Sequence, residues 1–279
     1  MKFGILVSYV RFEEKKIFEA LRNRGVEFDK IYDNEIILDY QRNNIPYDLI
    51  LDRSISHTRS LQCLKIFNDW GIKTVNSWEV ANICGDKSLT TSVLVSSGIP
   101  MPRTMIAYSP ESALKAIEEM GYPVVLKPAI GSWGRLISKV NDREAAEGLI
   151  EHKKTLGTYH HSSFYIQKYI DKPGRDIRVL VIGDRIATAI YRKSSHWITN
   201  ASRGASAEVC EVTKEIEELS LKAARAVGGG ILAVDILEDG DKYLVIEINY
   251  TPEFKLLYET TGVDIAGMMV DYALEVAKK

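Results

Sequence analysis

Residues 231–249 read ILAVDILEDGDKYLVIEIN and combine a strand pattern with three polar side chains. Two apolar, β-rich runs flank the turn sequence EDGD at 238–241, which predicts a hairpin of two antiparallel strands. Asp235 lies in the first strand. Glu247 and Asn249 lie two residues apart at the end of the second, so their side chains point to the same face. The turn would bring Asp235 beside them.

The chemistry of these three side chains favours a magnesium site. Two carboxylates and one amide oxygen are hard oxygen ligands, which suit Mg²⁺ bound to phosphates. Glu247 lies between Ile246 and Ile248, and a carboxylate buried in such a strand is costly unless it is paired or bound to a metal. The alternative is a hairpin whose polar residues simply lie on its solvent-exposed face. The burial argument favours Mg²⁺ held by Asp235, Glu247 and Asn249.

A glycine-containing loop occurs earlier in the chain, at residues 127–135, KPAIGSWGR. The β-rich runs 122–127 and 135–140 flank it, and the first of them ends in Lys127. Glycines let backbone N–H groups approach a polyphosphate closely, and a lysine adds a point charge. Neither GxxxxGK[ST] nor GxGxxG occurs in the sequence, so the Walker A and Rossmann loops are excluded. A phosphate-binding loop and a plain hairpin loop both remain open.

A third polar segment, residues 192–204, carries two arginines. Arg192 and Arg203 can clamp a carboxylate or phosphate with two parallel hydrogen bonds, and they stay charged. The alternative is a solvated basic loop, which we favour for Lys193 and His196.

The rest of the chain predicts an α/β protein of three units. Strand and helix signals alternate over the first 85 residues, which predicts a small doubly wound domain with a parallel sheet. Helix 12–23 and strands 2–8, 28–32, 48–51 and 72–76 belong to it. We place the units at residues 1–86, 87–174 and 175–279.

Composition excludes several classes of protein. The 279 residues include 36 Lys plus Arg and 38 Asp plus Glu, a net charge of −2 that excludes a strongly basic nucleic-acid footprint. No apolar run is long enough for a spanning helix. The three cysteines are far apart and form no CxxC pair, so a disulfide framework is not expected. We expect a cytoplasmic protein that binds neither nucleic acid nor membrane.

The order of these motifs resembles the ATP-grasp superfamily, and within it the RimK-type ligases. More narrowly, the whole chain is similar to the LysW-dependent amino-acid ligases LysX and ArgX. The segments that carry this resemblance are Cys84–Lys87, Lys127–Arg135, Gly174–Arg178, His196–Asn200 and Thr261–Ile265. The resemblance implies an ATP-grasp fold: the small doubly wound N-terminal domain and two α+β lobes that clamp ATP. It also implies a homo-oligomer.

The resemblance further implies a role for each matching position. Catalysis falls to Arg192, Lys127 and Arg178. ATP is bound by Lys87, Lys127, Gly131, Ser132, Trp133, Gly134, Arg135, Gln167, Lys168, Tyr169, Ile170, Asp176 and Asn200. Substrate is bound by Arg192, Trp197, Arg203, Gly204, Glu253, Phe254, Lys255, Leu256 and Leu257. The metal ligands are Asp235, Glu247 and Asn249.

The implied activity is ATP-dependent ligation in lysine or arginine biosynthesis. The γ-carboxylate of the C-terminal glutamate of the carrier protein LysW would form an acyl phosphate, which the α-amino group of α-aminoadipate or glutamate would attack. Leu256 and Leu257 follow Glu-Phe-Lys and match neither the polar pair of LysX nor the Gly-Phe pair of ArgX, which predicts use of both amino acids.

Two alternatives remain: a RimK-like glutamate ligase acting on another protein or peptide, and a non-catalytic ATP-binding module. The complete set of motif residues argues against the second.

Overall fold

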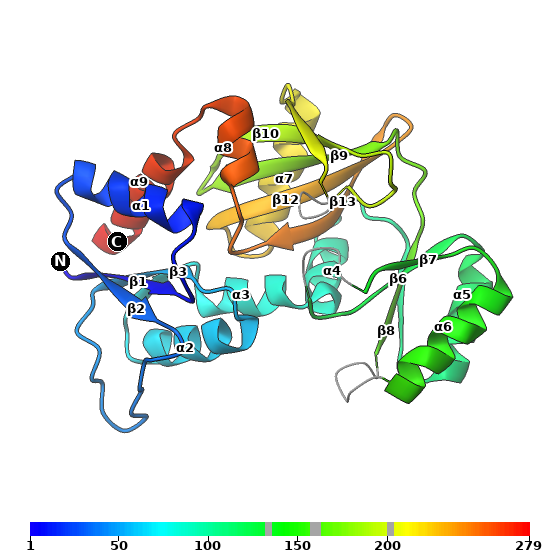
Figure 1. The fold of residues 1–279 in the computed structure, drawn as a ribbon, viewed down its shortest axis with the longest axis horizontal. Coiled ribbons are helices and arrows are strands. Elements are labelled where there is room, and N and C mark those ends of the chain that lie inside the picture. Colours follow the sequence, from blue (N-terminus) through cyan, green and yellow to red (C-terminus); the bar gives the residue numbers. More distant parts are fainter. Residues whose placement is uncertain (132–135, 157–162, 200–203) are drawn as a thin grey trace.

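The computed structural model describes residues 1–131, 136–156, 163–199 and 204–279, which form three β-sheets (Figure 1). A four-stranded sheet lies at the N-terminal end, a five-stranded sheet carries the C-terminal half, and a second four-stranded sheet lies between them in sequence. No helix in the described ranges has the length and apolar character needed to cross a membrane.

The N-terminal sheet has the order β2-β1-β3-β4 and is parallel throughout, which confirms the predicted doubly wound domain. Its strands are β1 (Phe3–Val7), β2 (Phe28–Tyr32), β3 (Leu49–Arg53) and β4 (Lys73–Val75). The helices of this region are α1 (Phe12–Asn23), α2 (His57–Asp69), α3 (Trp78–Gly85) and α4 (Lys87–Ser96). The ends of α1 match the sequence prediction, whereas α3 was not predicted.

The central sheet is antiparallel and has the order β5-β8-β6-β7. Its elements are β5 (Thr104–Ala107), α5 (Pro110–Met120), β6 (Val124–Lys127), β7 (Ser138–Val140), α6 (Arg143–Leu156) and β8 (Phe164–Lys168). Helices α5 and α6 cover one face of this sheet (Figure 1). A separate hydrophobic core, which includes Ile117, Leu126 and Ile166, lies between these helices and the sheet.

The C-terminal sheet, order β11-β10-β9-β12-β13, is also antiparallel. Its elements are β9 (Arg175–Ile182), β10 (Arg185–Lys193), β11 (Ser206–Val209), α7 (Lys214–Ala226), β12 (Ile231–Asp239), β13 (Lys242–Asn249), α8 (Lys255–Thr261) and α9 (Ile265–Lys278). Strand β11 begins inside the segment that we expected to be a loop, because Ser206 and Ala207 pair with the end of β10. Helix α8 was also not predicted.

The N-terminal domain and the C-terminal sheet share one hydrophobic core. Phe3 and Leu21 pack in the same cluster as Leu180 and Ile265, and α9 lies along α1 (Figure 1). Burial of this shared apolar surface is the main force that holds the two regions together.

A buried asparagine adds hydrogen bonds across the same boundary. Asn76 Nδ2 donates to the carbonyl oxygens of Ile231 (2.8 Å) and Tyr250 (2.6 Å), and its Oδ1 accepts from Ile231 N (2.7 Å). Residue 230 must be glycine, because a Cβ there would lie 2.0 Å from Asn76 Oδ1 and φ is +114°. Asn76 therefore ties the N-terminal domain to two places in the C-terminal half: the first residue of β12 and the residue that follows β13.

Candidate functional site

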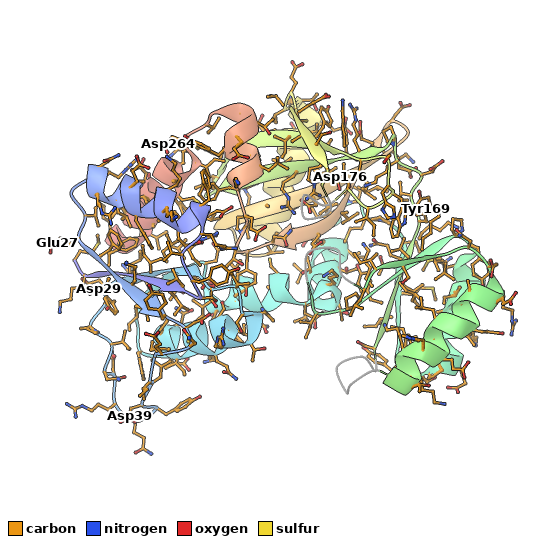
Figure 2. The ribbon with its side chains drawn as sticks, viewed as in Figure 1. Glu27, Asp29, Asp39, Tyr169, Asp176 and Asp264 are labelled. Carbon is orange, nitrogen blue, oxygen red and sulfur yellow. The ribbon has the colours of Figure 1, made fainter. Side chains whose placement is uncertain are left out.

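A cavity of about 690 Å³, its open mouth included, lies between the central and C-terminal sheets. Its walls come from β6, β8, the segment after β8, and strands β9, β10, β12 and β13. Tyr169 and Asp176, which both line it, lie where the two sheets meet (Figure 2). The two walls therefore belong to two separately packed parts of the chain.

One end of the cavity is apolar and aromatic. The segment Gln167–Ile170 lines it together with Trp197, and the rings of Tyr169 and Trp197 meet edge to face at 6.2 Å. Lys139 Nζ lies 3.6 Å from the centre of the Tyr169 ring. This end can accept a flat aromatic ring between aromatic and apolar side chains. Apolar lining residues that sequence reasoning missed are Val125, Ile137, Ile198, Leu237 and Ile246.

Two lysines lie close to Glu247: Lys127 lines the cavity, and Lys87 lies beside it. Lys127 Nζ donates to Gln167 Oε1 at 2.6 Å. Lys87 Nζ donates to the Gly131 carbonyl oxygen at 2.5 Å and lies 3.6 Å from Glu247 Oε1. Desolvation, with the positive charges of Lys87 and Lys172 adding to it and Glu247 opposing it, lowers the pKa of Lys127 to about 8. These lysines suit phosphate groups, whose negative charge would offset the repulsion among the lysines.

The β12–β13 hairpin forms as predicted. Asp235 lies directly opposite Glu247, and Asn249 lies opposite Ala233. The expectation that Glu247 is buried is wrong: its side chain is 25% exposed and lines the cavity, because that face of edge strand β13 opens into it. The burial argument for a metal therefore fails, although the oxygen-donor argument stands.

The residues of the proposed metal site fit Mg²⁺ in part. Glu247 faces the cavity, and Asn249 Nδ2 is buried with no hydrogen-bond partner among the described residues. Asp235, by contrast, already binds two arginines. No group of three His, Cys, Asp or Glu side chains suited to a metal occurs in the described part of the chain. Glu247 and Asn249 of β13 are the members of the set for which the described residues include no arginine partner.

Asp235 belongs to a buried ladder of charges across β10, β9 and β12. Arg178 donates to both oxygens of Asp235 at 2.8 Å. Arg192 donates to both oxygens of Asp176, at 2.7 and 2.9 Å, and its Nη2 lies 3.1 Å from Asp235 Oδ2. Although burial alone would raise the pKa of Asp235, Arg178 and Arg192 lower it, so this carboxylate stays ionised.

Two neighbours of the ladder were missed by sequence reasoning. Thr199 donates its hydroxyl to Asp176, and Lys172 Nζ donates to Thr199 Oγ1 at 2.6 Å and lies 3.6 Å from Asp176 Oδ2. Lys172 is placed by the tertiary fold alone, since no motif marks it. Both residues line the cavity, where the lysines are Lys127, Lys168 and Lys172.

Only some of the other predicted site residues line the cavity. Lys168 and Ile170 line it, whereas Gly204 and residues 253–257 do not. Phe254 and Leu257 are buried in the shared core, and their contact with substrate stays a prediction. Glu253 and Lys255 are exposed and Leu256 is half-buried. Four loop and two substrate-loop positions lie outside the described residues: Ser132, Trp133, Gly134, Arg135, Asn200 and Arg203.

Two antiparallel sheets that enclose a cavity carrying lysines at one end define the ATP-grasp class of ATP-binding ligases. The chain belongs to the RimK-like ATP-grasp family, whose domain model matches residues 84–273, and a LysX preATP-grasp domain model matches residues 3–83. The family membership confirms the predicted fold class and the assignment as an ATP-dependent enzyme.

Individual relatives match over the whole length. The glutamate–LysW ligase ArgX of Sulfurisphaera tokodaii is 37% identical, with 99% of each chain covered. The α-aminoadipate–LysW ligase LysX of Saccharolobus solfataricus is 34% identical, over 96% of this chain and 99% of its own. Among solved structures, a RimK-domain ATP-grasp protein of Sphaerobacter thermophilus superposes with a TM-score of 0.82 at 25% identity, over 98% and 99% of the two chains.

Proposed function

We propose that the protein ligates glutamate, α-aminoadipate or both to the γ-carboxylate of the C-terminal glutamate of the carrier protein LysW. Full-length similarity to relatives of both named activities supports the reaction. The observation that carries the proposal for this chain is the cavity itself, which Lys127, Glu247 and Arg192 all line.

The cavity suggests how ATP would bind. Its aromatic end, between Tyr169 and Trp197, would hold the adenine ring, and Lys87 and Lys127 would bind the phosphates. Glu247 and Asn249 would hold Mg²⁺, with Asp235 as a third ligand if it shares its oxygens with the arginines. The bound ion would neutralise charge on the β- and γ-phosphates.

The reaction would need no covalent bond to the protein. An oxygen of the carrier γ-carboxylate attacks the γ-phosphorus of ATP, which forms the acyl phosphate and releases ADP. The α-amino nitrogen then attacks the acyl carbon, phosphate leaves, and the amine loses a proton. Arg178 and Arg192 are fixed by buried carboxylates and would stabilise negative charge on the transferring group without further reorganisation.

The proposal for the amino-acid substrate rests on the residues that follow Lys255 in the sequence. Glutamate and α-aminoadipate differ by one methylene, and a hydrophobic site discriminates one methylene by only about 10–200-fold. Of the two leucines that follow Lys255, Leu256 is half-buried and Leu257 lies in the core. Leu256 offers no polar partner at a fixed depth, so we propose that both amino acids are used, with kcat/KM values within about two decades of each other.

A second candidate is a RimK-type ligase that acts on another acceptor. A tetrahydromethanopterin:α-L-glutamate ligase of Methanococcus maripaludis is 35% identical over 75% of this chain. The test is to offer the purified enzyme ATP, Mg²⁺ and glutamate with LysW or with a pterin acceptor. Modified LysW supports the first proposal, and modification of the pterin alone supports the second.

A further inference from the structure

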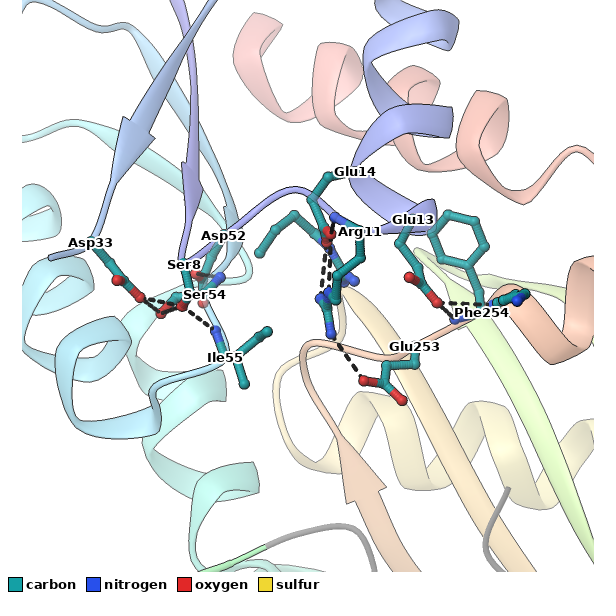
Figure 3. Close-up of polar contacts among 12 residues, drawn as sticks. Ser8, Arg11, Glu13, Glu14, Asp33, Asp52, Ser54, Ile55, Glu253 and Phe254 are labelled. Atoms are coloured by element: carbon teal, nitrogen blue, oxygen red, sulfur yellow. Dashed lines mark hydrogen bonds and ion pairs between the residues drawn. The ribbon is translucent and has the colours of Figure 1, made fainter. Parts of the chain in front are cut away.

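Helix α8 begins directly after Phe254, whose phenyl ring has no atom that can cap a helix. A residue of the N-terminal domain supplies the cap. Glu13 of α1 accepts hydrogen bonds through Oε1 from Phe254 N (3.2 Å) and Lys255 N (3.0 Å), across 241 and 242 positions of sequence (Figure 3). A negatively charged carboxylate at this place also interacts favourably with the positive, N-terminal end of the helix dipole.

The cap lies in a water-poor environment. Glu13 is 5% exposed and Phe254 is fully buried. The ring of Phe12 packs edge to face on Phe254, with centroids 6.5 Å apart, and also contacts Tyr258 at 5.5 Å. Hydrogen bonds to an ionised acceptor are the stronger kind, and removal of a buried acceptor leaves its donors unsatisfied. Glu13 therefore fixes the backbone of this segment firmly.

A second contact joins the same two segments. Arg11 Nη1 donates to Glu253 Oε1 at 2.9 Å, and Arg11 is itself held by the buried Glu14 (Figure 3). Glu14 also accepts from Arg53 Nε, at the end of β3, at 3.2 Å. Because the Glu253 side chain is 46% exposed, its ion pair contributes less than the buried cap.

We propose that Glu13 is a positioning residue for the amino-acid substrate. Residues 253–256 follow Asn249, a proposed metal ligand, by four to seven positions, and seven residues of extended chain span at most about 25 Å. Chain length therefore keeps the segment within that distance of the proposed metal site, and Glu13 of another domain holds the backbone from which Lys255 and Leu256 project. The identity of the substrate rests on the proposed function, whereas the cap that Glu13 provides does not depend on it.

The experiment compares three variants of the full chain. Glu13→Ala removes the acceptor, whereas Glu13→Gln keeps an oxygen that can accept from both amides. Glu19→Ala is the control, since Glu19 lies exposed on the same helix and pairs only with Lys16 among the described residues. Each variant is measured for backbone hydrogen exchange in residues 252–260, for the Kd of ATP, and for the KM of glutamate and α-aminoadipate.

For Glu13→Ala we expect exchange in this segment to accelerate about fivefold or more, the factor that corresponds to loss of a helix cap. Amino-acid KM should rise about tenfold while the ATP Kd stays within twofold. Glu13→Gln should keep both the exchange rate and the amino-acid KM close to the parent values, and Glu19→Ala should resemble the parent. Unchanged exchange, or a KM that does not move, would overturn the proposal. If the parent couples no amino acid to LysW, the proposed function fails, and exchange alone still decides whether Glu13 positions the segment.

Discussion

The ammonium group of Lys127 shows how the cavity is prepared for a ligand. It is desolvated, lies near two other lysines, and has Gln167 as its hydrogen-bond acceptor. Its pKa of about 8 means that the free protein holds this charge only weakly just above neutral pH. A polyphosphate beside it would raise the pKa of Lys127 again.

This pKa predicts proton uptake when ATP binds. Between about pH 8 and 9 the free protein loses the Lys127 proton, whereas the complex keeps it, so ATP affinity should fall as pH rises, by up to about tenfold per unit. Calorimetry in buffers of different ionisation enthalpy measures the uptake. Lys127→Met should abolish it and weaken binding by about 1.5–3 kcal/mol. Equal uptake by parent and variant would show that Lys127 does not contact the phosphates.

Glu247 is the residue whose loss should stop the chemistry most cleanly. Glu247→Gln keeps the shape of the side chain but removes the charge that faces Lys87 and the proposed Mg²⁺. Carrier-dependent ADP release should fall by about 10²–10³-fold, the range seen when one stabilising group is removed from an active site. Release close to that of the parent, in a variant with an unchanged melting curve, would refute the metal assignment.

Residue patterns predicted part of this site. The placement of Glu247 and Asn249 on one face followed from the two-residue period of a strand, which is a local property. The pairing of Asp235 with Arg178 could not be predicted, because it depends on β9 lying beside β12 in a particular register. Lys172 and Thr199 were missed for the same reason, since only tertiary contacts bring them to Asp176.

At the scale of elements, the structures that were predicted and those that were missed differ in what defines their ends. Helix α1 has an amphipathic period and a glycine soon after its end, so local sequence sets its length. Helix α8 begins where Glu13 supplies a cap from 241 residues away, and only its end, at Gly262, carries a local signal. Helix α3 has its own cap, Ser77, but its eight residues fill the short stretch between the predicted strand 72–76 and the next unit, where no helix was predicted.

The join between β4 and the β12–β13 pair gives a prediction about stability. Asn76→Ala would leave the buried N–H and C=O groups of Ile231 and the Tyr250 carbonyl without this partner. The free energy of unfolding should fall by about 2–4 kcal/mol. Asn43→Ala is the control, since Asn43 is exposed and should change stability by less than about 0.5 kcal/mol. Equal denaturation midpoints would contradict the role of Asn76.

At the scale of the whole molecule, two differently packed bodies enclose the nucleotide cavity. The N-terminal domain and the C-terminal sheet share one core, whereas the central sheet has another. The alternation of strands and helices predicted the N-terminal sheet, and the resemblance of ordered motifs supplied the ATP-grasp architecture. The shared core could not be predicted, because apolar patterns show which faces are buried but not which partner covers them.

The most direct test of the proposed function is the mass of the carrier itself. Purified LysW is incubated with the enzyme, ATP, Mg²⁺ and equal amounts of glutamate and α-aminoadipate, and intact LysW is analysed by mass spectrometry. We predict two products, each heavier than LysW by one amino acid less one water and each absent without ATP. LysW that stays unmodified, while the same enzyme is folded and binds ATP, would contradict the proposed function.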